Sequence, residues 1–111
     1  MLTVYGIPNC DTLKKAIVWL KENGLEYQFH DYKKQGITPE KLTEWLTQTD
    51  HQTLINRAGT TWKQLSDEQK ADVKDNESAI ALMLGKPSVI KRPVIEQNDQ
   101  IVKIGWKPAE L

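Results

Sequence analysis

The start of the chain constrains the fold most strongly, because its hydrophobic period changes from two to 3.6 and back to two. The segment "LTVY" (2–5) is rich in β-forming residues and ends at Gly6, which is typical of a short buried strand. From 11 to 23 apolar residues recur at helical spacing, and they predict an amphipathic helix that stops at Gly24. The alternation in "EYQFHDY" (26–32) predicts a second strand. Together these elements form a βαβ unit, so we expect a parallel strand pair with a right-handed crossover.

A block of short helices is expected in the middle of the chain. Thr38 and Pro39 supply a capping hydroxyl and a proline at the first helical position. Ser66 and Gln69 have the spacing of a capping box. The expected helices cover 39–48, 53–59 (closed by Gly59), 60–65, 67–73 and 77–85, the last capped by Asn76 or Asp75.

The hydrophobic period returns to two near the C-terminal end. β-Branched residues surround Pro93 in 88–96, and the turn-like "NDQ" (98–100) separates them from "IVKIGW" (101–106). This pattern predicts an antiparallel hairpin, and "KPAEL" (107–111) is expected to start a helix. The whole order predicts an α/β fold with a βαβ half, a ββα half, a mixed sheet and an inserted helical subdomain.

Composition narrows the class of protein. The 111 residues suit one domain, and 15 basic residues balance 15 acidic ones, which favours neither nucleic acid nor an anionic membrane. We see no membrane span and no secretion signal. A single cysteine cannot form an internal disulfide, so we expect a cytoplasmic protein. His30 and His51 have no cysteine neighbours, so no metal site is expected.

Cys10 lies where the first strand gives way to the helix. If the helix begins near Asp11, the sulfur occupies the N-cap beside unpaired backbone N–H groups, which stabilise a thiolate. The negative charge of Asp11 opposes this effect. Thr12 could donate its hydroxyl to the thiolate or only cap the helix, and Lys14 and Lys15 either add positive potential or form a solvated face. A small, inert apolar residue is the alternative for the cysteine, and we favour the reactive thiol.

Pro93 and two arginines are further candidates. A proline within a β-patterned stretch removes a ladder donor, and a cis Arg92–Pro93 bond would explain its presence. Arg57 and Arg92 carry planar guanidinium groups suited to oxyanions and carboxylates. Taken alone, two arginines on the surface are the simpler interpretation, and Arg92 is the better candidate because it precedes the unusual proline.

Four segments in order resemble the arsenate-reductase-like (ArsC) family of thioredoxin-fold proteins, which includes the Spx regulators and the YffB-type proteins. They are "YGIPNCDTLKKA", "LINRAGTTWKQL", "KPSVIKRPVI" and "GWKPAEL", and the first two look closest to the YffB-type branch. The resemblance covers 1–111 as a single domain. It implies a thioredoxin-like core formed by 1–32 and 87–111, a helical insertion over 33–86, and a cis-proline facing the cysteine.

The resemblance implies that Cys10 is the nucleophile and that a set of residues binds the substrate or glutathione: Asn9, Thr12, Arg57, Arg92, Pro93 and Lys107. Two positions depart from the arsenate reductases. Gly6 stands where they have a histidine, and Lys107 stands where they have a third arginine. Lysine keeps the charge but loses bidentate geometry. These departures count against an arsenate site built like theirs and leave a thiol site intact.

The resemblance therefore implies a glutathione-dependent monothiol reductase. Without a second cysteine, an external thiol must resolve the mixed disulfide, so glutathione is the expected co-substrate, with no tightly bound cofactor. A glutaredoxin is a candidate partner, and we expect a monomer that binds neither nucleic acid nor membranes. One alternative is a true arsenate reductase coupled to glutaredoxin. Another is an Spx-like regulator that binds RNA polymerase, although Leu13 occupies the place of the second cysteine of the Spx redox switch.

Overall fold

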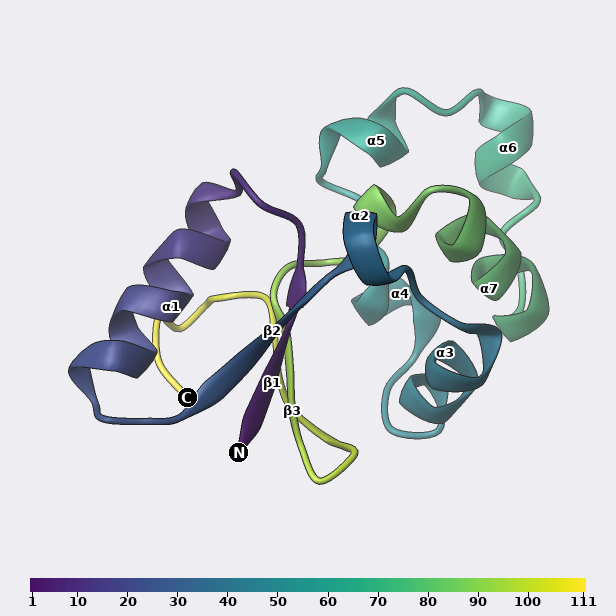
Figure 1. Ribbon diagram of the computed structural model, residues 1–111. Helices are drawn as coiled ribbons and strands as arrows, with labels where there is room; N and C mark the ends of the chain where they lie inside the picture. The colour runs from purple at the N-terminus through teal and green to yellow at the C-terminus, as the bar shows by residue number, and fades with distance from the viewer. The chain divides into compact units, whose positions relative to one another are not determined.

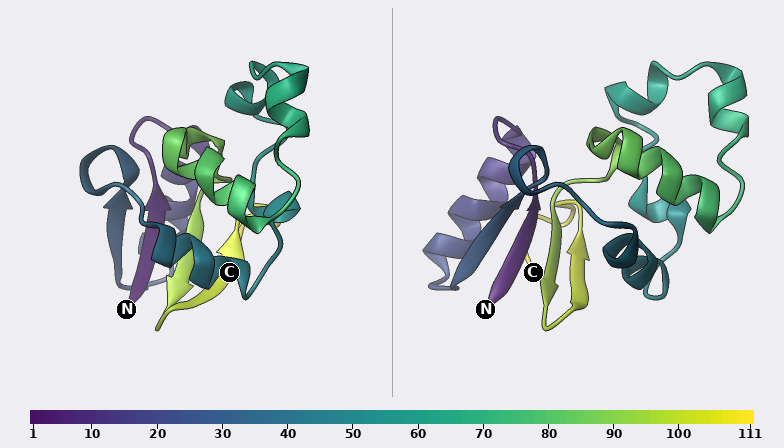
Figure 2. Two further views of the ribbon diagram at one scale, coloured as in Figure 1. Left: turned by 90° about the vertical axis from the view of Figure 1, so that its right-hand side faces the viewer. Right: turned by 45° about the vertical axis from the view of Figure 1, so that its right-hand side comes forward.

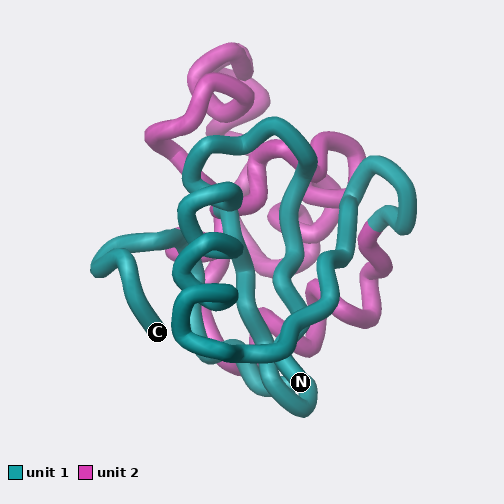
Figure 3. The backbone as a smooth tube through the Cα atoms, turned by 60° about the vertical axis from the view of Figure 1, so that its left-hand side comes forward, with its two compact units in different colours: residues 1–36, 92–111 teal, residues 37–91 magenta.

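The computed structural model describes residues 1–111, which divide into two compact units. Unit 1 comprises 1–36 and 92–111, and unit 2 comprises 37–91; Figure 3 draws them in teal and magenta.

Unit 1 is a four-stranded mixed sheet with one long helix. The strand order is β2 (Tyr27–Asp31), β1 (Leu2–Gly6), β3 (Val94–Gln97) and β4 (Gln100–Ile104). β1 pairs with β2 in parallel and with β3 antiparallel, and β3 pairs with β4 antiparallel. Helix α1 (Asp11–Glu22) forms the crossover between β1 and β2 (Figure 1). The predicted parallel pair and the predicted C-terminal hairpin are confirmed.

Helix α1 covers one face of the sheet because its apolar residues fall on one side of the helix (Figure 2). The fully buried Leu20 illustrates the energetics, since burying a leucine side chain contributes about 1.5–3 kcal/mol. The buried residues of this core come from α1, β1, β3 and the segment after β4: Leu2, Val4, Leu13, Ala16, Leu20, Ile95 and Trp106.

Unit 2 is helical, and α3 packs against α7. Trp45 of α3 and Met83 of α7 have no exposed surface. None of the helices in the chain combines the length and the apolar composition needed to cross a bilayer. The elements of this unit are α3 (Pro39–Leu46), α4 (His51–Leu54), α5 (Thr60–Lys63), α6 (Asp67–Ala71), α7 (Asn76–Gly85) and the 3-10 helix η1 (Pro87–Val89).

The boundaries of the units lie a few residues later in the chain than the expected 32/33 and 86/87. At the first boundary, Asp31 at the end of β2 accepts a hydrogen bond from the Lys33 N–H and so starts the short helix α2 (Tyr32–Gln35) within unit 1. At the second, the Lys91 N–H donates to the Leu54 carbonyl at 2.8 Å, which holds the end of the segment on unit 2.

Three local predictions were wrong. The helix expected over 53–59 ends at Leu54, because Ile55 is extended and pairs with Ile90 in an antiparallel bridge. The strand expected over 88–96 begins only at Val94, after the 3-10 helix and the proline, which has no N–H to donate to the sheet. The helix expected from 107 is absent, and bends occupy 105–109, since so short a segment does not stabilise a helix without tertiary packing.

Candidate thiol site

One edge of the unit 1 sheet collects an end of every strand. Gly6, the last residue of β1, pairs with Asp31, the last residue of β2. Tyr5 pairs with Val94, the first residue of β3, which also pairs with Ile104, the last residue of β4. The segments that follow β1, β2 and β4 and the segment that precedes β3 therefore emerge at the same edge.

Most of the expected site residues belong to these segments, and a hydrogen bond joins two of the segments directly. The Gly105 N–H, just after β4, donates to the Pro93 carbonyl at 2.8 Å. Arg57 is the exception, because it belongs to unit 2. The residues that share the edge are Asn9, Cys10 and Thr12 after β1, Arg92 and Pro93 before β3, and Lys107 after β4.

Cys10 is the N-cap residue of α1. Its backbone is extended (φ −100°, ψ 119°), and its carbonyl accepts the Lys14 N–H at 3.0 Å, so the helix begins directly after it. The half-buried thiol is free, and no side chain caps the first turn of the helix. The open N-terminal amides and the helix dipole therefore favour an anionic ligand at this helix end.

The approach to the cysteine is a tight turn. Asn9 has a left-handed backbone (φ 63°), a conformation that asparagine tolerates better than most residues. At Gly6, an added Cβ would lie 3.2 Å from Leu13 Cδ2. A side chain at this position would therefore press on a core residue of α1, which is a local reason for glycine here.

The Arg92–Pro93 peptide bond is cis, the conformation that would explain a proline in this β-patterned stretch. Pro93 is buried and Arg92 is half-buried. This places a guanidinium at the entry to β3. Lys107, by contrast, is exposed and precedes a second cis bond, to Pro108.

Tyr32 is a neighbour of this edge that sequence reasoning missed. It is buried, and its hydroxyl has no hydrogen-bond partner. Burial raises the pKa of Tyr32 well above its usual value near 10, Tyr5 and Glu96 raise it further, and the positive charge of Arg92 opposes them. The only sequence signal was its position directly after the predicted strand, so nothing marked it as different from a core tyrosine.

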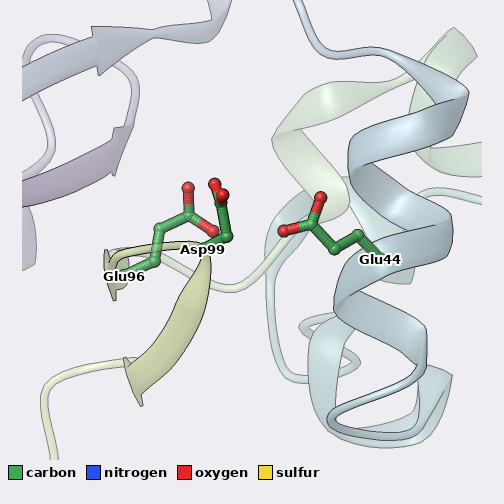
Figure 4. A group of neighbouring side chains, drawn as sticks. All are labelled: Glu44, Glu96 and Asp99. Carbon is green, nitrogen blue, oxygen red and sulfur yellow. The ribbon is translucent and has the colours of Figure 1, made fainter.

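A polar network lies on the sheet face opposite α1. The Tyr5 hydroxyl donates to Glu96 Oε1 at 2.6 Å, and Figure 4 shows Glu96 on β3 and Asp99 in the turn after it. His30 stacks on Tyr5 with a centroid distance of 4.6 Å, and its Nε2 lies 2.6 Å from the Gly36 carbonyl oxygen. Tyr5 and His30 are therefore both engaged in structural contacts within unit 1.

Arg57 lies in the turn that leads into α5. The turn is anchored by the Asn56 N–H, which donates to the Val89 carbonyl at 2.7 Å. The exposed guanidinium lies above the ring of Trp62, with Cζ 4.7 Å from the ring centroid. The structure therefore gives Arg57 a local partner within unit 2.

Comparison with known proteins shows relatives over the whole chain. The model of the ArsC family matches residues 5–111. An uncharacterised protein of Haemophilus influenzae is 41% identical, covering 99% of this chain and 95% of its own. The Streptococcus mutans global transcriptional regulator Spx is 25% identical, covering 100% of this chain and 80% of its own.

Solved structures agree with this result. A structure described as the YFFB protein has a TM-score of 0.89 and 49% identity, covering 98% of this chain and 94% of its own. An arsenate reductase (ArsC) related protein from Brucella melitensis has a TM-score of 0.81 and 47% identity, covering 97% of this chain and 88% of its own. The α/β architecture predicted from the sequence is confirmed.

Proposed function

The chain belongs to the ArsC family and has the thiol-redox fold of arsenate-reductase-like proteins, and from this premise we propose that it is a glutathione-dependent monothiol reductase. The observation that carries the proposal is the free thiol of Cys10 at the uncapped N-terminus of α1. Arg92 emerges at the same sheet edge. A nucleophile at a helix N-terminus, with an arginine at the same sheet edge, suits an anionic disulfide.

The proposed reaction is thiol–disulfide exchange in two steps. The Cys10 thiolate attacks the glutathione sulfur of a mixed disulfide, the old S–S bond breaks, and the released thiolate takes a proton from water. The chain has one cysteine, so the Cys10–glutathione disulfide cannot be resolved internally. The thiolate of a second glutathione attacks it, which releases glutathione disulfide and restores the Cys10 thiolate.

In this proposal the remaining site residues bind rather than react. Arg57 and Arg92 pair with carboxylates of glutathione, since guanidinium and carboxylate form two parallel hydrogen bonds. Two of them, Asn9 and Thr12, flank Cys10 in the sequence. Pro93 emerges at the same sheet edge, where Lys107 adds positive charge. A glutaredoxin remains a candidate partner for recycling the enzyme.

The experiment is turnover of a glutathionylated peptide in the presence of glutathione, with the Cys10–glutathione adduct followed by mass spectrometry. Cys10→Ser should lose the adduct and at least about 100-fold of the turnover, because it removes the nucleophile. Arg92→Gln should raise KM. Equal turnover by wild type and Cys10→Ser, both folded by circular dichroism, would contradict the proposal.

Arsenate is the second candidate oxidant, favoured by the description of the Brucella relative as arsenate reductase related. Gly6 and Lys107 count against it. Arsenate reduction that disappears in Cys10→Ser and exceeds the rate with the glutathionylated peptide would establish it in place of the first proposal.

A non-enzymatic regulator that binds RNA polymerase is the third candidate, favoured by the similarity to Spx. A redox switch of the Cys-x-x-Cys kind is not available to it, because the chain has one cysteine and Leu13 occupies the place of the second. RNA polymerase retained by the purified full chain, together with no turnover, would favour this candidate.

A further inference from the structure

Arg57 has an unusual set of contacts for an exposed arginine. Its guanidinium lies over the indole of Trp62, with Cζ 4.7 Å from the ring centroid. The indole itself is only 8% exposed. The guanidinium forms no ion pair and no hydrogen bond with the protein, so all of its N–H donors are free for a ligand.

The backbone on both sides of this contact is fixed by the local sequence "NRAGTTW" (56–62). The Asn56 N–H donates to Val89, and the Gly59 N–H donates to the Asn56 carbonyl at 3.2 Å. Thr61, next to the indole, has its Oγ1 3.0 Å from Ser88 Oγ. Both ends of the contact are therefore tied to the segment 88–89 of the same unit.

The turn also requires a small residue. A Cβ at Gly59 would lie 2.8 Å from Asn56 Nδ2 and 3.3 Å from the Asn56 backbone oxygen. Glycine thus lets the chain fold back tightly enough for α5 to begin at Thr60. As a result Trp62 is brought under a side chain five residues earlier.

We propose that Trp62 is a positioning residue that holds the Arg57 guanidinium over its ring, with the N–H donors free for a carboxylate of glutathione. The identity of the anion rests on the proposed function. The two contacts do not compete, because the cation–π contact leaves the N–H donors available to the oxygens of a carboxylate. A lysine at position 57 would keep the charge but lose the planar fork.

The stack also reduces the entropy that binding costs. A free arginine side chain loses rotamer entropy when it is ordered. An arginine already held on an indole loses less of it when the anion arrives. Trp62 therefore acts on affinity, and not on the chemistry at Cys10.

The test is a double-mutant cycle in the full chain, with glutathione sulfonate as the probe. This compound keeps the carboxylates of glutathione but cannot exchange with Cys10. By calorimetry we expect Arg57→Gln to weaken binding about 10-fold. Trp62→Leu should weaken it about 2- to 5-fold, the range of an exposed cation–π contact. Trp62→Phe, which keeps an aromatic face, should recover most of the loss.

The decisive quantity is the effect of Trp62→Leu in the Arg57→Gln background. A positioning role predicts no further loss there, since the group being positioned is gone. In turnover, Trp62→Leu should raise KM and leave kcat unchanged. An equal loss in both backgrounds, or no loss in wild type, would overturn the inference.

Two controls separate positioning from folding. Lys103→Gln removes the other cation–π contact of the chain, in which Lys103 Nζ lies 5.6 Å from the Trp106 ring centroid, and it should leave the affinity unchanged. If Trp62→Leu fails to fold, Arg57→Lys provides the test, because Arg57 is exposed and its substitution does not disturb the core. This variant should lose most of the affinity for the probe although it keeps the charge, and an affinity equal to that of wild type would overturn the inference.

The outcomes also separate this inference from the proposed function. A non-additive cycle in a protein without Cys10-dependent turnover would sustain the role of Trp62 and remove the reductase. Normal Cys10-dependent turnover, together with an unchanged affinity for the probe in Trp62→Leu, would sustain the reductase and overturn the role of Trp62. Absence of any binding of the probe to wild type would overturn the role of Trp62.

Discussion

Four helices of unit 2 have an N-cap side chain that accepts a hydrogen bond from the first turn, whereas the N-cap residue of the long helix of unit 1 is a cysteine that accepts none with its side chain. Each of the four capping oxygens accepts a backbone N–H three residues further on, and the caps are Thr38, Asp50, Ser66 and Asp75. In unit 1, the short helix α2 is capped by Asp31, but α1 starts at Cys10 without a side-chain cap.

The remaining uncapped α-helix is α5, whose N-cap residue is Gly59, next to the turn that carries Arg57. The two helix starts without a capping side chain thus lie beside two of the residues expected in the site. Capping side chains are thus present at the other α-helices, and a thiol or the glycine of a tight turn occupies the N-cap where they are absent.

The largest effect should come from the core of unit 2. Trp45→Ala removes a fully buried side chain and should destabilise the protein by about 3–5 kcal/mol. Amide hydrogen exchange should show the greater loss of protection within 37–91. Leu20→Ala, expected to cost about 2–5 kcal/mol, is the matched change in unit 1. Equal loss of protection in both units from either variant would show that they unfold together.

The caps can be exchanged to test the comparison directly. Cys10→Ser places a good N-cap residue on an extended backbone and should stabilise the protein by about 0.5–1 kcal/mol while removing the nucleophile. Asp75→Ala removes a capping box and should destabilise the protein. Urea denaturation measures both. A destabilised Cys10→Ser would mean that the sulfur, not an open helix end, stabilises this turn.

A smaller effect is expected at the start of α5. Gly59→Ala forces the Asn56 side chain to move and should cost about 0.5–1 kcal/mol. Gly85→Ala is the control, because nothing lies within 4 Å of a Cβ there, and it should be neutral or slightly stabilising. Thermal unfolding of the two variants checks this. The same loss in both would rule out a special requirement at Gly59.

The smallest effect is the response of the caps to acid. Hydrogen bonds from Thr53 and from Ser78 lower the pKa values of Asp50 and Asp75, and the charge of His51 adds to both shifts. A lowered folded-state pKa stabilises the protein above the unfolded value of about 3.9, and this contribution is lost as the pH falls through the folded value.

The urea midpoint of wild type should therefore fall between pH 6 and pH 3. Asp50→Asn with Asp75→Asn should flatten this dependence, because asparagine also caps a helix but does not ionise in this range. A dependence unchanged in the double variant would assign the acid response to other carboxylates.

The parts of the fold that depend on residues close together in the chain could be predicted from the sequence. The helix starts at Thr38 and Ser66 are confirmed, since a cap depends on residues three or four apart. The left-handed turn residues Asn98 and Asp99 form the predicted hairpin. The βαβ unit follows from periodicity alone, because the crossover is short and its handedness is general.

The sequence by itself determined the βαβ and hairpin halves, the helix starts at Thr38 and Ser66 and the position of Cys10 at a helix start. Only the tertiary structure decided that Ile55 is extended, since its partner Ile90 lies far along the chain. The same holds for the start of β3 at Val94 and for the indole under Arg57. Hydrogen bonds and packing between distant segments outweigh local propensities of a few tenths of a kcal/mol per residue.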